Sequence, residues 1–229
     1  MKPLFITSAC FVFLFSACSS ENKPELKEQA DKESYSLGYQ FGKNLKFEEA
    51  EINFDSYIAG LRDGFGGKEP RIPLDEVRSA IANFQQRLAS AQQKKQKELA
   101  EKNLAEGNAF LAENAKKEGV KTLPSGLQYQ VLTEGSGRTP KKSDTVTVNY
   151  RGTLISGTEF ESSYGRPVPP TFQVDGLIPG WSEALQMMKE GAKWVLFIPP
   201  NLAYGEKGSP PVIPPNSVLI FEIELISIQ

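Results

Sequence analysis

The hydrophobic pattern of this 229-residue chain changes its period at Gly119. Before Gly119, apolar residues recur three or four positions apart, which is the spacing of one face of an α-helix. After Gly119, they alternate with polar residues, as on one face of a β-strand. The two periods in succession predict an α+β protein in which an all-helical arm precedes a C-terminal antiparallel sheet.

Alternating runs predict the strands of this C-terminal domain, which we place at residues 119–229. The runs lie at residues 127–131, 146–154, 172–174, 194–198 and 219–225, and Ser156-Gly157 predicts a turn into residues 159–160. One helix is predicted at residues 181–189, closed by Gly191. The sheet is expected to curl around this one short helix in order to bury it.

Residues 33–118 are predicted to be helical. Apolar residues recur there with helical spacing, at Tyr35, Leu37, Tyr39, Phe41 and Leu45. Gly38 and Gly42 lie four apart and would let another helix approach closely. Asp55 is expected to cap a second helix that stops at residues 66–67. A third helix without proline, from about residue 75 to 118, would be roughly 65 Å long.

The helical arm carries little apolar material for a core of its own. Val77, Ile81, Phe84 and Leu88 form its clearest apolar stripe, and residues 92–98 are almost wholly polar. We therefore expect residues 33–118 to form a homodimer in which the helices of two chains intertwine and bury their stripes mutually. The alternative is a three-helix bundle within one chain.

The N-terminus has the features of an export signal, which we place at residues 1–17. Lys2 precedes an apolar stretch at residues 4–15, which is too short to span a bilayer. Ser16-Ala17-Cys18 resembles a bacterial lipobox, so we expect lipidation at Cys18. Residues 18–32 would form a tether. The protein would then be anchored in the bacterial cell envelope at the outer membrane, facing the periplasm or the surface. The alternatives are a plain secretory signal or an uncleaved anchor.

Several chemistries are excluded by residues that the sequence lacks. The chain has no histidine, which removes the commonest general base and metal ligand, and both cysteines, Cys10 and Cys18, lie in the first twenty residues. Lys and Arg number 26 against 28 Asp and Glu, so no basic surface for nucleic acid is expected. We expect neither a metal site nor a cofactor.

Seven sequence blocks between residues 122 and 229 resemble, in the same order, those of FKBP-type peptidyl-prolyl cis-trans isomerases. They are residues 148–154, 157–163, 177–185, 197–200, 202–205, 213–217 and 219–225. Residues 35–42 resemble the N-terminal dimerisation region of the macrophage infectivity potentiator subgroup of that family.

The resemblance implies an apolar pocket for proline-containing polypeptides, which would also bind the family's macrolide inhibitors. The catalytic residues would be Tyr150, Phe160, Glu161, Trp181, Tyr204 and Phe221, and the substrate-binding residues Phe172, Leu177, Ile178 and Ile213. Trp181 would form the floor, and the Tyr204 hydroxyl and Ile178 N–H would bind carbonyl groups. Glu161 stands where the family usually has aspartate.

Such a pocket can be an enzyme without an acid, base or nucleophile. Rotation about X–Pro is slow because it breaks amide resonance, and an apolar pocket that strips water from the planar amide favours the twisted one. We therefore expect isomerisation of X–Pro bonds in exported proteins, together with chaperone activity. The alternative is a catalytically inactive holdase or binding module of the same fold.

Overall fold

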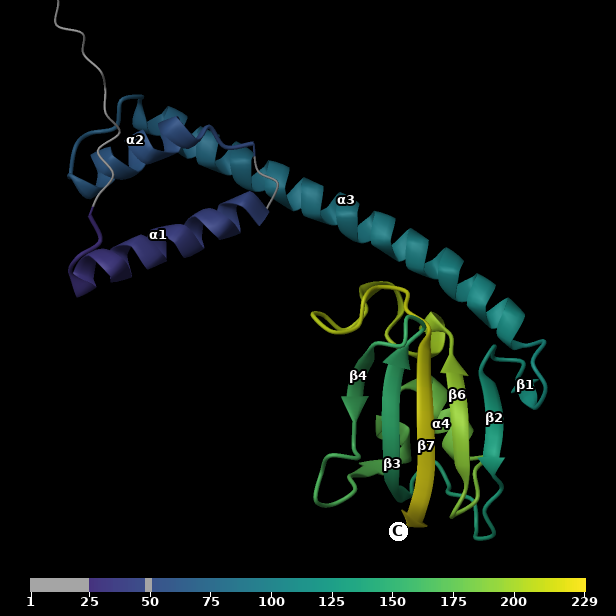
Figure 1. Ribbon diagram of the computed structural model, residues 1–229. Coiled ribbons are helices and arrows are strands. Elements are labelled where there is room, and N and C mark those ends of the chain that lie inside the picture. Colours follow the sequence, from purple (N-terminus) through teal and green to yellow (C-terminus); the bar gives the residue numbers. More distant parts are fainter. Residues whose placement is uncertain (1–24, 48–50) are drawn as a thin grey trace, which may run out of the picture. The chain divides into compact units, whose positions relative to one another are not determined.

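The structure, a computed structural model, describes residues 25–47 and 51–229 (Figure 1). It confirms the predicted class, since helices precede an antiparallel sheet that curls around one short helix. Contacts divide the chain into two compact units, one ending at Leu74 and the other running from Asp75 to Gln229. We predicted a domain boundary after residue 118. By its contacts, however, the long helix that begins near residue 75 is grouped with the sheet.

Two helices make up the described part of the N-terminal unit, α1 (Gln29–Phe47) and α2 (Phe54–Phe65). Helix α1 begins inside the stretch that we predicted as a tether, residues 18–32. The cap of α2 is Asn53 rather than Asp55, because the Asn53 side chain accepts a hydrogen bond from the N–H of Ser56 at 2.9 Å. Asp55 lies in the first turn, where its negative charge suits the helix dipole.

Helix α3 (Leu74–Asn114) is unbroken, and its 41 residues correspond to about 62 Å. It begins directly after Pro73, as predicted, but ends four residues before residue 118. The Gln128 side chain explains the early end: its amide nitrogen donates to the carbonyl oxygen of Leu111 at 2.9 Å, and its oxygen accepts from the Asn114 amide at 3.0 Å. These two bonds tie the last turn of α3 to β2, in addition to the bond that the Leu111 carbonyl oxygen accepts from the N–H of Ala115.

The seven strands form one sheet in the order β1-β2-β6-β7-β3-β4, with β5 paired to β3. Their bounds are β1 (Val120–Thr122), β2 (Gln128–Thr133), β3 (Thr145–Leu154), β4 (Glu159–Ser162), β5 (Thr171–Gln173), β6 (Lys193–Ile198) and β7 (Leu219–Ile228). Every pairing is antiparallel. The short strand β1 is the one that the hydrophobic pattern did not predict.

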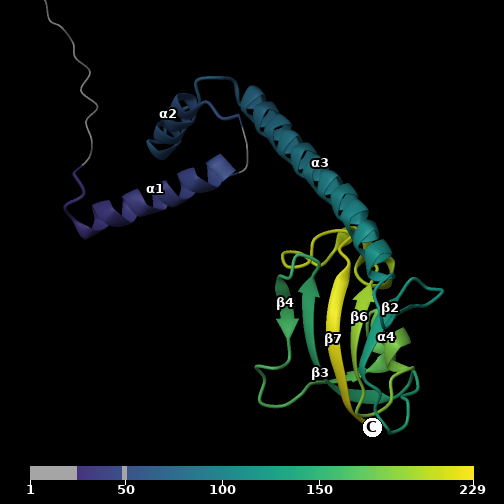
Figure 2. The same ribbon diagram turned by 45° about the vertical axis from the view of Figure 1, so that its right-hand side comes forward.

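Irregular pairings bend the sheet around helix α4 (Pro179–Leu185), as both ribbon views show (Figures 1 and 2). The register shifts between Thr147 and Val148 in the pairing of β3 with β7, and between Gly152 and Thr153 in the pairing of β3 with β4. Such bulges increase the local twist of a strand pair. The inward residues of the strands and α4 form the hydrophobic core.

Helix α4 is shorter than predicted, since it ends at Leu185 rather than at residue 189. Met188 is nevertheless buried, because the chain after α4 continues as turns against the core. Gly191 adopts a φ of 83°, but it lies in the turn that leads into β6 and not at the helix end. The apolar pattern therefore predicted the burial of this segment correctly and its helical length incorrectly.

The predicted signal sequence, Cys10 and Cys18 lie outside the described residues. Among residues 25–47 and 51–229, no helix is long and apolar enough to cross a membrane. The same part of the chain contains no cluster of three or more acidic, cysteine or histidine side chains suited to a metal ion.

Candidate active site

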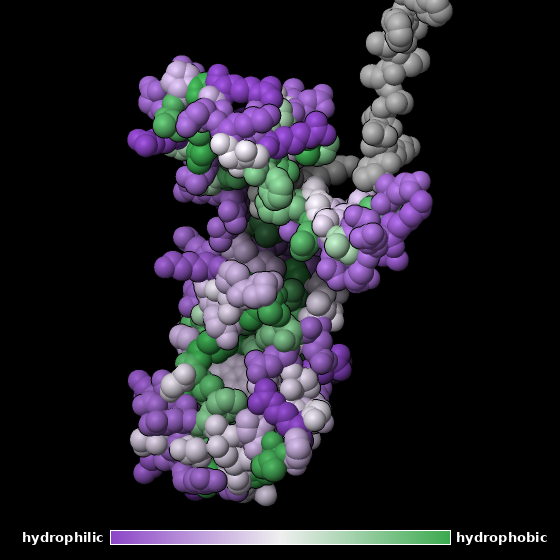
Figure 3. Space-filling model, turned by 90° about the vertical axis from the view of Figure 1, so that its left-hand side faces the viewer, coloured by the Kyte–Doolittle hydropathy of each residue, from purple (hydrophilic) through white to green (hydrophobic). Residues whose placement is uncertain are grey.

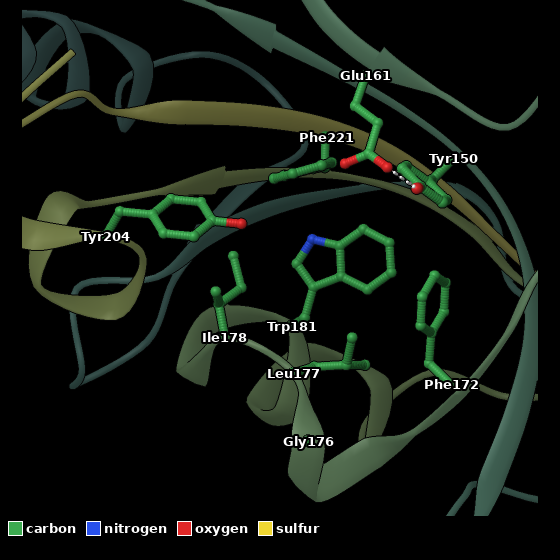
Figure 4. A pocket seen from close by; sticks show the side chains of 9 residues that line it. All are labelled: Tyr150, Glu161, Phe172, Gly176, Leu177, Ile178, Trp181, Tyr204 and Phe221. Atoms are coloured by element: carbon green, nitrogen blue, oxygen red, sulfur yellow. Dashed lines mark hydrogen bonds between the residues drawn. The ribbon is translucent and has the colours of Figure 1, made fainter. Parts of the chain in front are cut away.

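A cavity of about 320 Å³ opens on the concave side of the sheet (Figure 4). Its lining residues come from six different segments of the C-terminal unit, and all of them are labelled in the figure: Tyr150, Glu161, Phe172, Gly176, Leu177, Ile178, Trp181, Tyr204 and Phe221. Most of these side chains are apolar or aromatic, which is typical of small-ligand sites.

Strand alternation explains how β3 and β7 supply the wall. Tyr150 and Gly152 point to the same face of β3, and Gly152 lies directly opposite Phe221 on β7. A Cβ atom at Gly152 would lie 2.6 Å from the Phe160 ring and 2.7 Å from the Phe221 ring. Glycine at this position therefore makes the room that the two rings occupy.

Trp181, on α4, is the shared neighbour of the aromatic rings. Its ring centroid lies 5.0 Å from that of Phe221, 5.2 Å from that of Tyr150 and 6.3 Å from that of Phe172, with interplanar angles of 83° to 89°. These edge-to-face contacts add stabilisation beyond burial and hold the rings at fixed angles. Trp181 is only 4% exposed, and its Nε1–H has no hydrogen-bond partner in the described part of the chain.

Glu161 supplies the one carboxylate at this cavity. Its Oε1 accepts a hydrogen bond from the Tyr150 hydroxyl at 2.6 Å (Figure 4). The same oxygen accepts one from the Arg166 guanidinium at 3.2 Å. Burial, together with the hydrogen bond to Glu161, raises the pKa of Tyr150 to about 12. Tyr150 is therefore a neutral hydrogen-bond donor throughout the physiological range.

Tyr204 brings a second hydroxyl group to the cavity, and Figure 4 shows it pointing inward. Burial, followed by the charge of Glu161, raises the pKa of Tyr204 above its ordinary value. No hydrogen-bond partner of this hydroxyl is found among residues 25–47 and 51–229, so its proton is available to a ligand. The same holds for the N–H of Ile178, which precedes α4.

Eight of the ten residues that the sequence predicted for the pocket line this cavity. The two others are not among its lining residues: Phe160 packs edge to face against Phe221, with ring centroids 5.4 Å apart, and Ile213 is buried in the core. Gly176 was missed, because a glycine that contributes only backbone leaves no signal in a hydrophobic pattern. Arg166 was missed as well, because an arginine in an irregular loop gives no sign in the sequence of the carboxylate that it contacts.

This arrangement can bind an apolar ring and offer hydrogen bonds to carbonyl oxygens. The cavity has one carboxylate, already held by Tyr150 and Arg166, so the described residues do not form an acid–base pair of carboxylates there. Its chemistry is that of desolvation and orientation.

Comparison with known protein families matches two descriptions to the chain. Residues 30–131 match the "domain amino terminal to FKBP-type peptidyl-prolyl isomerase", and residues 136–226 match "FKBP-type peptidyl-prolyl cis-trans isomerase". The second match contains all the residues that line the cavity.

Individual proteins are similar over the full length. The "peptidyl-prolyl cis-trans isomerase Mip" of Coxiella burnetii is 46% identical over 229 residues, which are 100% of this chain and 99% of that protein. The "outer membrane protein MIP" of Legionella longbeachae is 42% identical over 230 residues, with the same coverage. The crystal structure of FkpA from Escherichia coli matches with a TM-score of 0.73 and 42% identity, covering 89% of this chain and 98% of that one.

Proposed function

The chain belongs to the FKBP-type peptidyl-prolyl cis-trans isomerases, and on that basis we propose that the cavity around Trp181 is where it accelerates rotation about X–Pro bonds. The observation that carries this assignment is the combination of an aromatic cavity with two donors at its lining, the inward Tyr204 hydroxyl and the Ile178 N–H, neither of which has a hydrogen-bond partner among the described residues. The proline ring would lie against Trp181, and the carbonyl groups beside it would reach the donors.

The rate acceleration follows from differential binding. A planar amide is polar and well hydrated, whereas the twisted transition state has lost resonance and is less polar. An apolar cavity that excludes water destabilises the planar amide relative to the twisted one, so it lowers a barrier of about 18–20 kcal/mol. Tyr204 and Ile178 fix the orientation of the peptide, so that binding energy is used at the rotating bond.

Glu161 takes the role of a positioning residue in this proposal. Its carboxylate is held by Tyr150 and Arg166, so the extra methylene, relative to the aspartate usual in the family, is accommodated without loss of an ion-pair partner. The carboxylate in turn fixes the Tyr150 ring, which contacts Trp181 edge to face. This network favours an active enzyme over the inactive holdase that the sequence left open.

A prolyl-peptide isomerisation assay on Tyr204→Phe and Trp181→Leu tests the assignment. Loss of one hydrogen bond to the transition state predicts a decrease in kcat/KM of about fivefold to tenfold for Tyr204→Phe. The Trp181→Leu decrease should be larger, because the contacts of three rings are lost. Tyr164→Phe is the matched control, since Tyr164 donates to Glu222 and does not line the cavity. Equal rates in all the variants would instead favour the holdase.

We also propose a location in the bacterial envelope, with lipid attached at Cys18. Support comes from the lipobox-like sequence at the N-terminus and from a relative named an outer membrane protein, which is similar over its full length. Metabolic labelling with a radioactive fatty acid tests this, and Cys18→Ala should abolish the label and release the protein from the membrane fraction.

A homodimer through residues 33–118 is the third part of the proposal. In the N-terminal unit, apolar side chains of α1 and α2 lie open to solvent, and Leu37 is 74% exposed. A groove of about 500 Å³ runs between the aromatic residues of the two helices, among them Tyr35, Phe41 and Tyr57. Figure 3 shows hydrophobic residues, in green, at the surface of this helical part among hydrophilic ones. So much exposed apolar surface favours burial by a second copy.

The clients of the enzyme would be exported polypeptides that expose proline. A paired molecule would offer two cavities to one unfolded chain and thereby give chaperone activity beyond catalysis. Macrolide inhibitors would compete for the same cavity, so a bound macrolide should suppress peptide isomerisation without preventing the helices from pairing.

A further inference from the structure

The last turns of α3 lie against the loop that precedes β7. Two asparagine amides cross this contact in opposite directions: Asn103 Nδ2 donates to the carbonyl oxygen of Pro215 at 2.8 Å, and Asn216 Nδ2 donates to that of Ala100 at 3.2 Å. Figures 1 and 2 show this end of α3, in teal, beside the loops in yellow and green. Helix and loop are thus tied to each other by a reciprocal pair of hydrogen bonds.

The backbone of α3 approaches the side chain of Val218 closely at Gly107, and this contact fixes the position of the helix along its axis. A Cβ atom at Gly107 would lie 2.7 Å from Cγ2 of Val218, which is too close for a real contact. One turn later, the rings of Phe110 and Phe197 pack with centroids 6.1 Å apart. The helix is therefore seated at one position along the loop.

The same loop segment is bonded to the turn that carries Tyr204. Asn216 has a positive φ of 52°, and its main-chain N–H donates to the carbonyl oxygen of Gly205 at 2.9 Å. Gly205 directly follows Tyr204 in the chain. Tyr204 is 41% exposed, so packing holds it less firmly than it holds the buried rings, and its position depends on the backbone of its turn.

We propose that helix α3 positions Tyr204, with Asn103 and Asn216 as the positioning residues. Asn216 is the bridge, because its side chain bonds to α3 and its main chain bonds to the turn next to Tyr204. Asn103 holds the neighbouring carbonyl of Pro215 and so keeps Asn216 in place. The inference rests on the proposed function, in which the Tyr204 hydroxyl binds a substrate carbonyl.

Two substitutions in the full chain test whether the contact between α3 and the loop before β7 affects catalysis without disrupting the fold. Asn103→Ala removes the bond to Pro215. Asn216→Gly keeps the positive φ and the main-chain bond to Gly205 but removes the side-chain bond to Ala100. Each should lower kcat/KM for a prolyl peptide by about threefold to tenfold, because a looser turn presents the hydroxyl in the right place less often. Asn108→Ala is the matched control, since Asn108 is an exposed asparagine on the same helix without a side-chain hydrogen bond in the described chain.

The decisive measurement repeats both substitutions in a Tyr204→Phe background. If α3 acts through Tyr204, a protein without that hydroxyl has nothing further to lose, so the two substitutions should then change kcat/KM by less than about twofold. An Asn103→Gln variant, which keeps the amide, should recover part of the rate. Thermal unfolding of each variant shows that the loss is measured on folded protein.

The results also distinguish a failure of this inference from a failure of the proposed function. If Tyr204→Phe alone lowers kcat/KM and the asparagine variants do not, α3 does not position Tyr204 and only this inference fails. The same conclusion follows if the asparagine effects are equally large with and without the hydroxyl. If Tyr204→Phe itself leaves kcat/KM unchanged, the assignment of the hydroxyl fails, and this inference fails with it.

Discussion

At the scale of single residues, Gly152 matters as much to the pocket as the rings that surround it. Gly152→Ala would place a methyl group 2.6 to 2.7 Å from the rings of Phe160 and Phe221. Neither ring can bend, so the pair of rings can no longer keep its positions, and a shift of Phe221 disturbs its edge-to-face contact with Trp181. We expect kcat/KM to decrease at least about tenfold and the free energy of unfolding to decrease by about 1–3 kcal/mol.

Two further variants make this prediction specific. Gly165→Ala is the control, because nothing lies within 4 Å of a Cβ atom there and its backbone does not require glycine. Phe160→Leu in the Gly152→Ala protein should recover part of the lost stability, since a smaller side chain vacates the space. If Gly152→Ala has normal activity, the orientation of Phe221 is irrelevant to catalysis. Urea unfolding and the peptide assay measure the two effects.

The titration of tyrosine gives a second prediction at this scale. The chain has no histidine, and the pKa of Tyr150 is about 12 while that of Tyr204 is also raised, so neither hydroxyl loses its proton near neutrality. We therefore expect kcat/KM to be constant from about pH 6 to about pH 9. A bell-shaped profile centred near neutral pH would show that a titrating acid or base takes part.

Stability should respond to pH where activity does not. Because the pKa of Tyr150 is higher in the folded than in the unfolded protein, its contribution is complete below about pH 10 and is lost as pH rises through about 12. The free energy of unfolding should fall by up to about 1.4 kcal/mol per pH unit in that window on account of this residue. Tyr150→Phe should remove this part of the slope in urea unfolding between about pH 10 and about pH 12.

At the scale of secondary-structure elements, a substitution at Gly107, where α3 contacts the sheet domain, has two opposing effects on stability. Gly107→Ala raises helix propensity by about 1 kcal/mol, but its methyl group would lie 2.7 Å from a methyl group of Val218, which is branched and almost fully buried. Overpacking of this kind typically costs about 1–3 kcal/mol, so it outweighs the gain. We expect Gly107→Ala to lower the melting temperature.

The partner residue provides the control. In a Val218→Ala protein, which is itself destabilised by a small cavity, Gly107→Ala should become neutral or stabilising, because the overlapping methyl group is gone. Equal destabilisation in both backgrounds would mean that the cost of Gly107→Ala does not come from the overlap with the Val218 methyl group. Calorimetry on the four proteins of this cycle decides the matter.

The elements also show which structural information is local in the sequence. The alternation in residues 146–154 depends on neighbours two apart, so β3 and its inward Tyr150 were predicted correctly. The register of β3 with β7 was not predictable, because a period of two does not say which residue faces Phe221. The hydrogen bonds of Asn103 and Asn216 join residues more than a hundred positions apart. An asparagine in a polar stretch of sequence does not indicate which residue it will bind.

Errors in the predicted elements have the same origin. The cap at Asn53 was misplaced by two residues because Asp55 is an equally good capping residue, and only the fold selects between them. The end of α3 at Asn114 lies where the Gln128 side chain of β2 contacts the helix. The residues of the helix itself do not indicate this contact. Ile213 and Phe160 have the apolar character of pocket residues, and only the packing shows that Phe160 contacts Phe221 and that Ile213 is buried.

At the scale of the whole molecule, the proposed catalytic cavity and the exposed apolar side chains of α1 and α2 lie in different units. Every residue that lines the cavity belongs to residues 75–229, whereas the exposed apolar side chains of α1 and α2 belong to the N-terminal unit. A change in pairing should therefore leave the turnover of a short peptide unaltered. Only a substrate long enough to reach two cavities would respond to it.

Gly38 offers a test of the proposed homodimer that does not disturb the single chain. Nothing lies within 4 Å of a Cβ atom built at Gly38, and leucine has a better helix propensity than glycine by about 0.5–1 kcal/mol, so Gly38→Leu should be harmless to α1 by itself. If a second copy approaches this face as closely as a glycine permits, the leucine side chain blocks it. We expect sedimentation at micromolar concentration to give a dimer for the unaltered protein and a weakened dimer for Gly38→Leu. Both proteins should have the same kcat/KM on a short prolyl peptide, but the variant should suppress aggregation of an unfolding client protein less well. A monomer in the unaltered protein, or an equally tight dimer in both, would refute pairing through this face of α1.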